Sequence, residues 1–147
     1  MPQRDSIHSI VKQSLINDGW EITDDPYVIS YGERFLFIDL GARGSKDVNQ
    51  GKLLAATRQD QKIAVEIKEL RGKSIIKELE QAIGQYVLYK LLINKIEPER
   101  QIYLATTDII YDEIFSEPIG KLVINDLPLK LIVIDSKKLE VIRWITH

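Results

Sequence analysis

A glutamate and a lysine lie two residues apart in a short apolar run that has the composition of a β-strand. Residues 62–70 read Lys-Ile-Ala-Val-Glu-Ile-Lys-Glu-Leu, so Glu66 and Lys68 are expected on one face, about 7 Å apart along the strand. An ionised group is costly to bury unless it is paired or binds a metal. The two residues therefore form either a solvated ion pair, worth about 0 to 1 kcal/mol, or part of a functional site.

A second acid, Asp39, lies near the end of residues 34–41, a run that is otherwise apolar on both faces. This pattern predicts a central strand of a hairpin. Phe35, Phe37 and Asp39 are expected to share one face of that strand. The aspartate either caps the turn at Gly41 or has a functional role, and the sequence leaves both readings open.

A long helix is predicted to begin after Ser74, a residue type that caps helix amino termini. Gln81, Gln85 and Tyr89 repeat every four residues and so are expected along one side of this helix. They form either a solvated flank or a row of polar groups that can bind a carboxylate, a lysine or a phosphate. Gly84 costs about 1 kcal/mol relative to alanine inside a helix, which predicts close packing against the sheet.

Together these residue types indicate a hydrolytic phosphodiesterase site. Two carboxylates from neighbouring strands repel each other, and Mg²⁺ relieves that repulsion through oxygen ligands. Asp39 and Glu66 are therefore the candidate ligands of Mg²⁺ or Mn²⁺. Lys68 would assist the attacking water or stabilise negative charge, and the polar row of the helix would position the site or the phosphate.

Composition limits the other classes of function. The 147 residues are 44% hydrophobic and 29% charged, as in an ordinary soluble protein, and predict one domain over residues 1–147. The absence of cysteine excludes disulfides and thiolate metal sites, and His8 and His147 are the only imidazoles. No apolar run approaches ~18 residues, so we expect a cytoplasmic protein without a membrane partner. The net charge of −2 lacks the basic excess of a protein that relies on phosphate attraction.

The order of expected elements predicts an α/β (α+β) fold in which helices cover a mixed central sheet. Residues 42–61 are polar, with a short helix at 52–58, and their role is left open, as is that of His8. The remaining expected elements are a first helix at about 6–18, strands at 20–22 and 27–31, a strand at 101–106, helices at 108–115 and from 118, and strands at 129–135 and 141–145.

The spacing of these residues resembles the signature of the restriction-endonuclease-like PD-(D/E)XK superfamily. Its Pro-Asp and Asp/Glu-x-Lys elements correspond to Ile38-Asp39 and Glu66-Ile67-Lys68, and residues 85–89 resemble the Gln-x-x-x-Tyr motif of RecB-type nucleases. The resemblance implies a restriction-endonuclease-like mixed sheet flanked by helices. The chain departs from the pattern at Ile38, where proline is frequent, and at His8, where many resolvase-like members have glutamate.

Over nearly its full length the chain also resembles the XisH family. The segments that carry this resemblance are Arg4-Asp5, Leu15 to Trp20, Asp25-Pro26, Ser30-Tyr31-Gly32, Asp39-Leu40-Gly41-Ala42, Val65-Glu66-Ile67-Lys68, Leu79 to Tyr86, Pro98-Glu99-Arg100 and Glu113 to Gly120.

Membership of that family implies a factor that controls excision of the fdxN element, a DNA segment removed by site-specific recombination in differentiating cyanobacteria. The implied partners are DNA, a XisI-type protein and a site-specific recombinase, and a homodimer is left open. Control of excision does not by itself establish cutting. The alternative function is therefore a non-catalytic accessory protein that binds the XisI-type partner or the recombinase.

Overall fold

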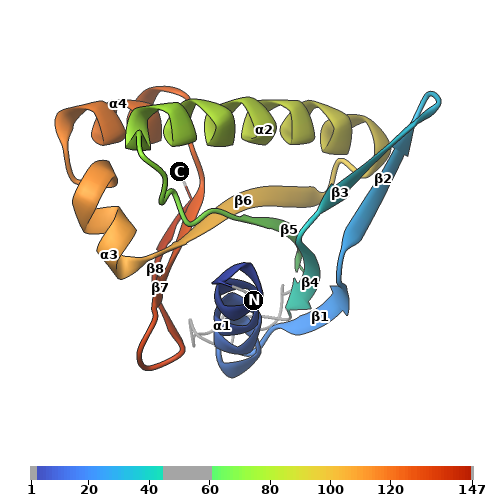
Figure 1. The fold of residues 1–147 in the computed structure, drawn as a ribbon. Coiled ribbons are helices and arrows are strands. Elements are labelled where there is room, and N and C mark those ends of the chain that lie inside the picture. Colours follow the sequence, from blue (N-terminus) through green and yellow to red (C-terminus); the bar gives the residue numbers. More distant parts are fainter. Residues whose placement is uncertain (1–2, 45–60, 147) are drawn as a thin grey trace.

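A six-stranded mixed sheet forms the centre of the molecule, as the computed structural model shows for residues 3–44 and 61–146 (Figure 1). Its strand order is β1-β4-β5-β6-β7-β8. The bounds are β1 Glu21–Asp24, β4 Leu40–Gly44, β5 Gln61–Ile67, β6 Arg100–Thr107, β7 Leu131–Asp135 and β8 Glu140–Ile145. Strands β5, β6 and β7 run parallel, and the outer pairings are antiparallel. The predicted mixed sheet flanked by helices is confirmed.

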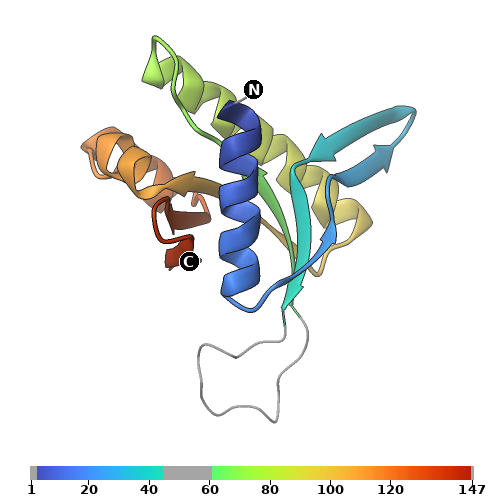
Figure 2. The same cartoon turned by 60° about the horizontal axis from the view of Figure 1, so that its bottom comes forward.

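Helices cover both faces of this sheet (Figures 1 and 2). The helical segments are α1 Gln3–Asn17, α2 Ile75–Ile96, α3 Asp108–Ile110, the π-helical turn η2 Tyr111–Phe115, and α4 Pro118–Asp126. Helix α1 ends where Gly19 adopts a φ of 100°, and Ser74 caps α2 by accepting a hydrogen bond from the Lys77 amide. No helix in the described ranges is long and apolar enough to cross a membrane.

The alternation of side chains along β5 divides the apolar residues into two cores. Ala64 packs with the inner side of α2, whereas Ile63 and Val65 pack with α1. Glu66 follows the same alternation and lies on the α2 side of the sheet, in agreement with the face predicted from the sequence. The strand therefore presents its carboxylate between the sheet and the long helix.

The predicted continuous strand at residues 34–41 is wrong. The chain bends at Asp39, so that β3, Arg34–Ile38, pairs with β2, Tyr27–Tyr31, in a separate two-stranded sheet, while β4 joins the central sheet. Ile38 belongs to the core under α2 and Leu40 to the core under α1, although residues two apart in one strand would share a face. The bend lets the two neighbours of Asp39 fill different cores.

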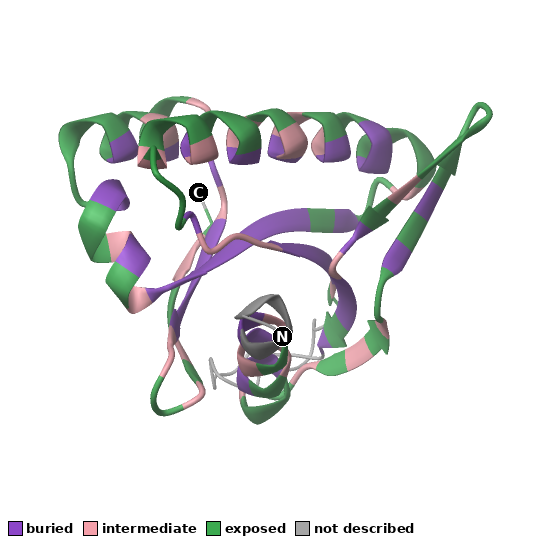
Figure 3. Cartoon of the chain, viewed as in Figure 1, coloured by how far each residue is buried: buried purple, intermediate pink, exposed green. Residues whose placement is uncertain are grey.

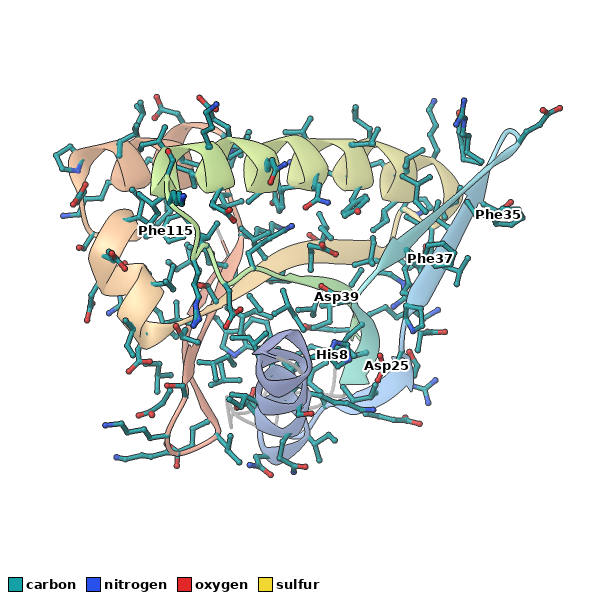
Figure 4. All side chains as sticks on the ribbon, viewed as in Figure 1. His8, Asp25, Phe35, Phe37, Asp39 and Phe115 are labelled. Atoms are coloured by element: carbon teal, nitrogen blue, oxygen red, sulfur yellow. The ribbon has the colours of Figure 1, made fainter. Side chains whose placement is uncertain are left out.

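The same bend exposes the aromatic face that the sequence placed in a buried strand. Phe35 is 67% exposed and Phe37 is 58% exposed, and Figure 4 shows both along the projecting hairpin. Only the other face of the hairpin, with Tyr27 and Ile29, packs into the core under α2. Hydrophobic content alone does not distinguish such a one-sided hairpin from a central strand.

Gly84 is exposed, and a Cβ added there would meet no atom within 4 Å, so the prediction of close packing against the sheet is wrong. Most of residues 42–61, including the predicted short helix at 52–58, lies outside the described residues.

Candidate functional site

The bend at Asp39 brings the two predicted acids together. Leu40 pairs with Val65 in the antiparallel β4–β5 ladder, which places Asp39 beside Glu66 at the carboxyl end of β5. The Asp39 amide donates to Glu66 Oε1 at 3.3 Å, and the Ile67 amide donates to Asp39 Oδ2 at 2.8 Å. Each carboxylate is thus held by a backbone amide of the segment that carries the other acid.

Lys68 lies beside this pair of acids. Its Nζ is 3.8 Å from Glu66 Oε2, and its backbone amide donates to the Ala105 carbonyl at 2.9 Å, which fixes the residue at the end of the parallel β5–β6 pairing. Glu66 is only 7% exposed. Asp39, Glu66 and Lys68 line one cavity of about 480 Å³, so the predicted convergence of these three side chains is present in the structure.

Helix α2 contributes two members of the predicted polar row. Gln85 lines the same cavity, and its Oε1 is buried without a hydrogen-bond partner in the described part of the chain. Burial, followed by the negative charges of Glu66 and Asp39, raises the pKa of Tyr89 to about 12. Tyr89 therefore lies near both acids as a protonated phenol.

Gln81 does not join this group. It is exposed and is not among the residues that line the cavity. Four residues of an α-helix turn through about 400°, so a row with this spacing drifts by about 40° at each step. The row reaches the inner side of α2 at Gln85 and Tyr89, and Gln81 remains on its outer flank.

Helix α1 contributes a histidine whose role the sequence left open. His8 lines the cavity, and its Nε2 lies 2.9 Å from Asp25 Oδ1, while Lys12 Nζ donates to Asp25 Oδ2 at 2.8 Å (Figure 4). Burial raises the pKa of Asp25, but the hydrogen bonds and positive charges of Lys12 and His8 outweigh it, and the pKa is lowered. Asp25 thus orients the His8 ring at the wall of the cavity. The spacing of His8 and Lys12 on one side of the helix was the available signal.

The donor set fits a cation that keeps much of its hydration. The described residues contain no group of three or more His, Cys, Asp or Glu side chains arranged around a metal position. Mg²⁺ commonly binds through one or two carboxylates and completes its shell with water and substrate phosphate. Asp39 and Glu66 supply that number of carboxylates, and the unpartnered Gln85 Oε1 offers an acceptor for a bound water.

The cavity continues along the ends of the parallel strands. An adjoining hollow of about 460 Å³ shares Ile7, Glu69 and Arg71 with it and is also lined by Thr107, which ends β6. Ligands of open sheets with parallel strands bind beyond the carboxyl ends of those strands. The acids therefore lie at one end of a longer depression at the expected edge of the sheet.

Comparisons with known proteins identify the family to which this chain belongs. The profile of the XisH protein family matches residues 1–142. The chain belongs to the XisH family. No curated protein matches it. The solved structure of an fdxN element excision controlling factor protein from Anabaena variabilis is 35% identical, with a TM-score of 0.82 over 97% of this chain and all of the other. A XisH family protein from Nostoc punctiforme PCC 73102 is 31% identical, with a TM-score of 0.81 and the same coverage.

Several segments that carry the XisH resemblance stabilise the fold. Arg100 is buried, donates to the Ile63 carbonyl at 2.8 Å, pairs with Glu97 and lies 4.3 Å from the centre of the Tyr27 ring. Gly120 packs so closely under η2 that a Cβ there would collide with backbone atoms. Relationship to the PD-(D/E)XK superfamily stays a prediction.

Proposed function

We propose that this XisH family protein is a divalent-metal-dependent phosphodiesterase that cuts DNA during programmed excision of a mobile element. The decisive observation is that Asp39, Glu66 and Lys68 line one cavity. Asp39 is far from the other two residues in sequence, and Lys68 is opposite in charge to both acids. The name of the Anabaena variabilis relative, an fdxN element excision controlling factor, supports the choice of DNA and of excision. The same cavity extends along the strand ends, where a nucleic-acid backbone would have room.

Asp39 and Glu66 would hold Mg²⁺ or Mn²⁺ through the carboxylate oxygens that their backbone hydrogen bonds orient. When bound, such an ion polarises a phosphoryl oxygen and lowers the pKa of a coordinated water. Lys68 brings positive charge to within 3.8 Å of Glu66 and is placed to stabilise negative charge that develops on the phosphate.

The helix side of the cavity would position the reactants. The carboxamide oxygen of Gln85 can accept a hydrogen bond from the attacking water, because it has no partner within the described ranges. Tyr89, with its pKa raised by burial and by the two acids, stays protonated near them. Gln81 has no direct part in this arrangement because it lies on the outer flank.

The direct test is cleavage of DNA by the purified protein. Supercoiled plasmid and a synthetic branched junction are incubated with Mg²⁺ or Mn²⁺, and nicked products are followed over time. Lys68→Ala should lower the rate by about 10² or more, a typical loss for a group that stabilises charge in the transition state. Lys121→Ala removes an exposed lysine on α4 and serves as the matched control for a contaminating nuclease.

Cutting by the wild type and the Lys121 variant, but not by the Lys68 variant, is the expected result. If all three proteins cut equally, or if the wild type leaves every DNA form intact, the proposed activity is wrong.

One observation favours a second candidate, a non-catalytic accessory protein. Carboxylates outnumber cationic side chains on the cavity wall, where Glu69 and Glu78 join the two central acids against Lys68 and Arg71. Such a surface repels DNA phosphates in the absence of a metal. In this role a XisI-type protein or the recombinase would supply the DNA contacts. A complex with such a partner that survives high salt and is unaffected by Glu66→Gln would support it.

A further inference from the structure

The side of α2 that points away from the sheet carries an apolar strip. Leu88 is 46% exposed and Leu91 is 60% exposed. Gly84, which is also exposed, lies one turn before Leu88. Helical geometry places these three residues within an arc of about 60°. Figure 3 shows exposed residues along this outer side of α2, opposite the buried residues that face the sheet.

Gly84 makes a notch in this strip. A Cβ added there would meet no atom within 4 Å, so nothing in the described part of the chain requires a glycine. Glycine is unfavourable in a helix interior relative to alanine. Its absence of a side chain does, however, allow another helix to approach closely, as small residues do where helices pack tightly.

Two charged residues border the strip. Glu80 precedes Gly84 by one turn, and Lys95 follows Leu91 by one turn. Within the described ranges, neither side chain makes an ion pair. They are separated by about 22 Å along the helix axis, since each residue rises 1.5 Å.

This charge pattern is complementary to itself in one orientation. If a second α2 lies antiparallel, with the two-fold axis between Val87 and Leu88, Glu80 of each helix faces Lys95 of the other. In that register the notch at Gly84 receives Leu91 from the other helix. A parallel arrangement in register would instead place Glu80 against Glu80. The charge pattern is therefore complementary to that of a second copy of this chain, related to the first by a two-fold axis.

We infer that the outer face of α2, formed by Glu80, Gly84, Leu88, Leu91 and Lys95, is a self-association surface through which two copies dimerise in antiparallel orientation. A single helix pair buries less area than a standard stable interface, so the dimer is in equilibrium with the monomer. Gln85 is half-buried and Tyr89 is buried toward the sheet, so neither belongs to this face, and the cavity stays open in the dimer. The inference is independent of the proposed cleavage activity.

Sedimentation equilibrium over a wide range of protein concentration tests this surface. The wild type should rise from the monomer mass toward twice that mass. Leu88→Glu combined with Leu91→Glu should keep the protein monomeric at every concentration. Leu122→Glu is the matched control, because Leu122 is an equally apolar and 56% exposed residue on α4, and it should leave the equilibrium unchanged. Circular dichroism of each variant verifies that the fold is retained.

Charge reversal tests the orientation. Glu80→Lys alone should raise the dissociation constant of the dimer by about tenfold or more, because it places like charges at both ends of the interface. Adding Lys95→Glu in the same chain should restore the wild-type constant. A wild type that stays monomeric throughout, a Leu122 variant that dissociates like the leucine pair, or a double reversal that fails to restore association would each overturn the inference.

Discussion

The same substitution at two glycines should change stability in opposite directions. In Gly120→Ala the new Cβ would overlap the Ile114 carbonyl and the Phe115 Cα, and backbone atoms cannot move aside as a flexible side chain can. Overpacking of this kind costs about 1 to 3 kcal/mol or more, against a gain of up to about 1 kcal/mol from helix propensity. In Gly84→Ala the Cβ enters open space, so only the gain remains.

Urea denaturation followed by circular dichroism measures both effects, at a protein concentration low enough to keep the chain monomeric. The free energy of unfolding should fall by about 2 kcal/mol in the Gly120 variant and rise by up to about 1 kcal/mol in the Gly84 variant. In thermal unfolding these changes correspond to about 3 °C per kcal/mol for a chain of this size. If Gly120→Ala is as stable as the wild type, or if Gly84→Ala is clearly destabilised, the helix packing described here is incorrect.

Two further outcomes follow from exposure and charge. Phe37→Ser should change the free energy of unfolding by less than about 1 kcal/mol, because Phe37 is exposed. Ile29→Ala, in the buried face of the same hairpin, should lower it by about 2 to 5 kcal/mol. Comparable losses for the two variants in urea denaturation would contradict the one-sided hairpin. Because Lys12 and His8 lower the pKa of Asp25, the folded state binds fewer protons at Asp25 than the unfolded state does. The contribution of Asp25 to the free energy of unfolding is therefore fully present above its ordinary pKa of 3.8 and is lost as the pH falls below that value. Asp25→Asn should therefore flatten the acid limb of the stability profile measured by thermal unfolding, and an unchanged acid limb would argue against the interaction.

Local periodicity was sufficient to predict the strand that carries Glu66 and the helix that carries Gln85 and Tyr89. The alternation in residues 62–70 placed Glu66 and Lys68 on one face, and the capping residue Ser74 located the start of α2. Both features depend on neighbours within a few positions, which a single sequence displays directly.

The bend at Asp39 and the contact between His8 and Asp25 could not be predicted, because both depend on packing between residues that are distant in sequence. The bend at Asp39 occurs because Ile38 and Leu40 enter different cores, and an apolar run does not record such a change of sheet. The contact between His8 and Asp25 joins residues 17 apart, across the rest of α1 and the whole of β1. The spacing of His8 and Lys12 shows that they share one side of α1, but it does not identify Asp25 as their partner, and the hydrophobic pattern does not record the bend at Asp39.

Binding of Mg²⁺ to the unmodified protein is the most direct test of the central claim that Asp39 and Glu66 form a metal site. At a Mg²⁺ concentration ten times the dissociation constant, binding to the folded state should stabilise it by about 1.4 kcal/mol, which raises the melting temperature by about 4 °C. Glu66→Gln should abolish this shift, whereas Glu78→Gln, which removes a carboxylate from another part of the same cavity wall, should retain it. A wild type that does not respond to Mg²⁺ or Mn²⁺, or an equal response in both variants, would contradict the metal site and the phosphodiesterase activity derived from it.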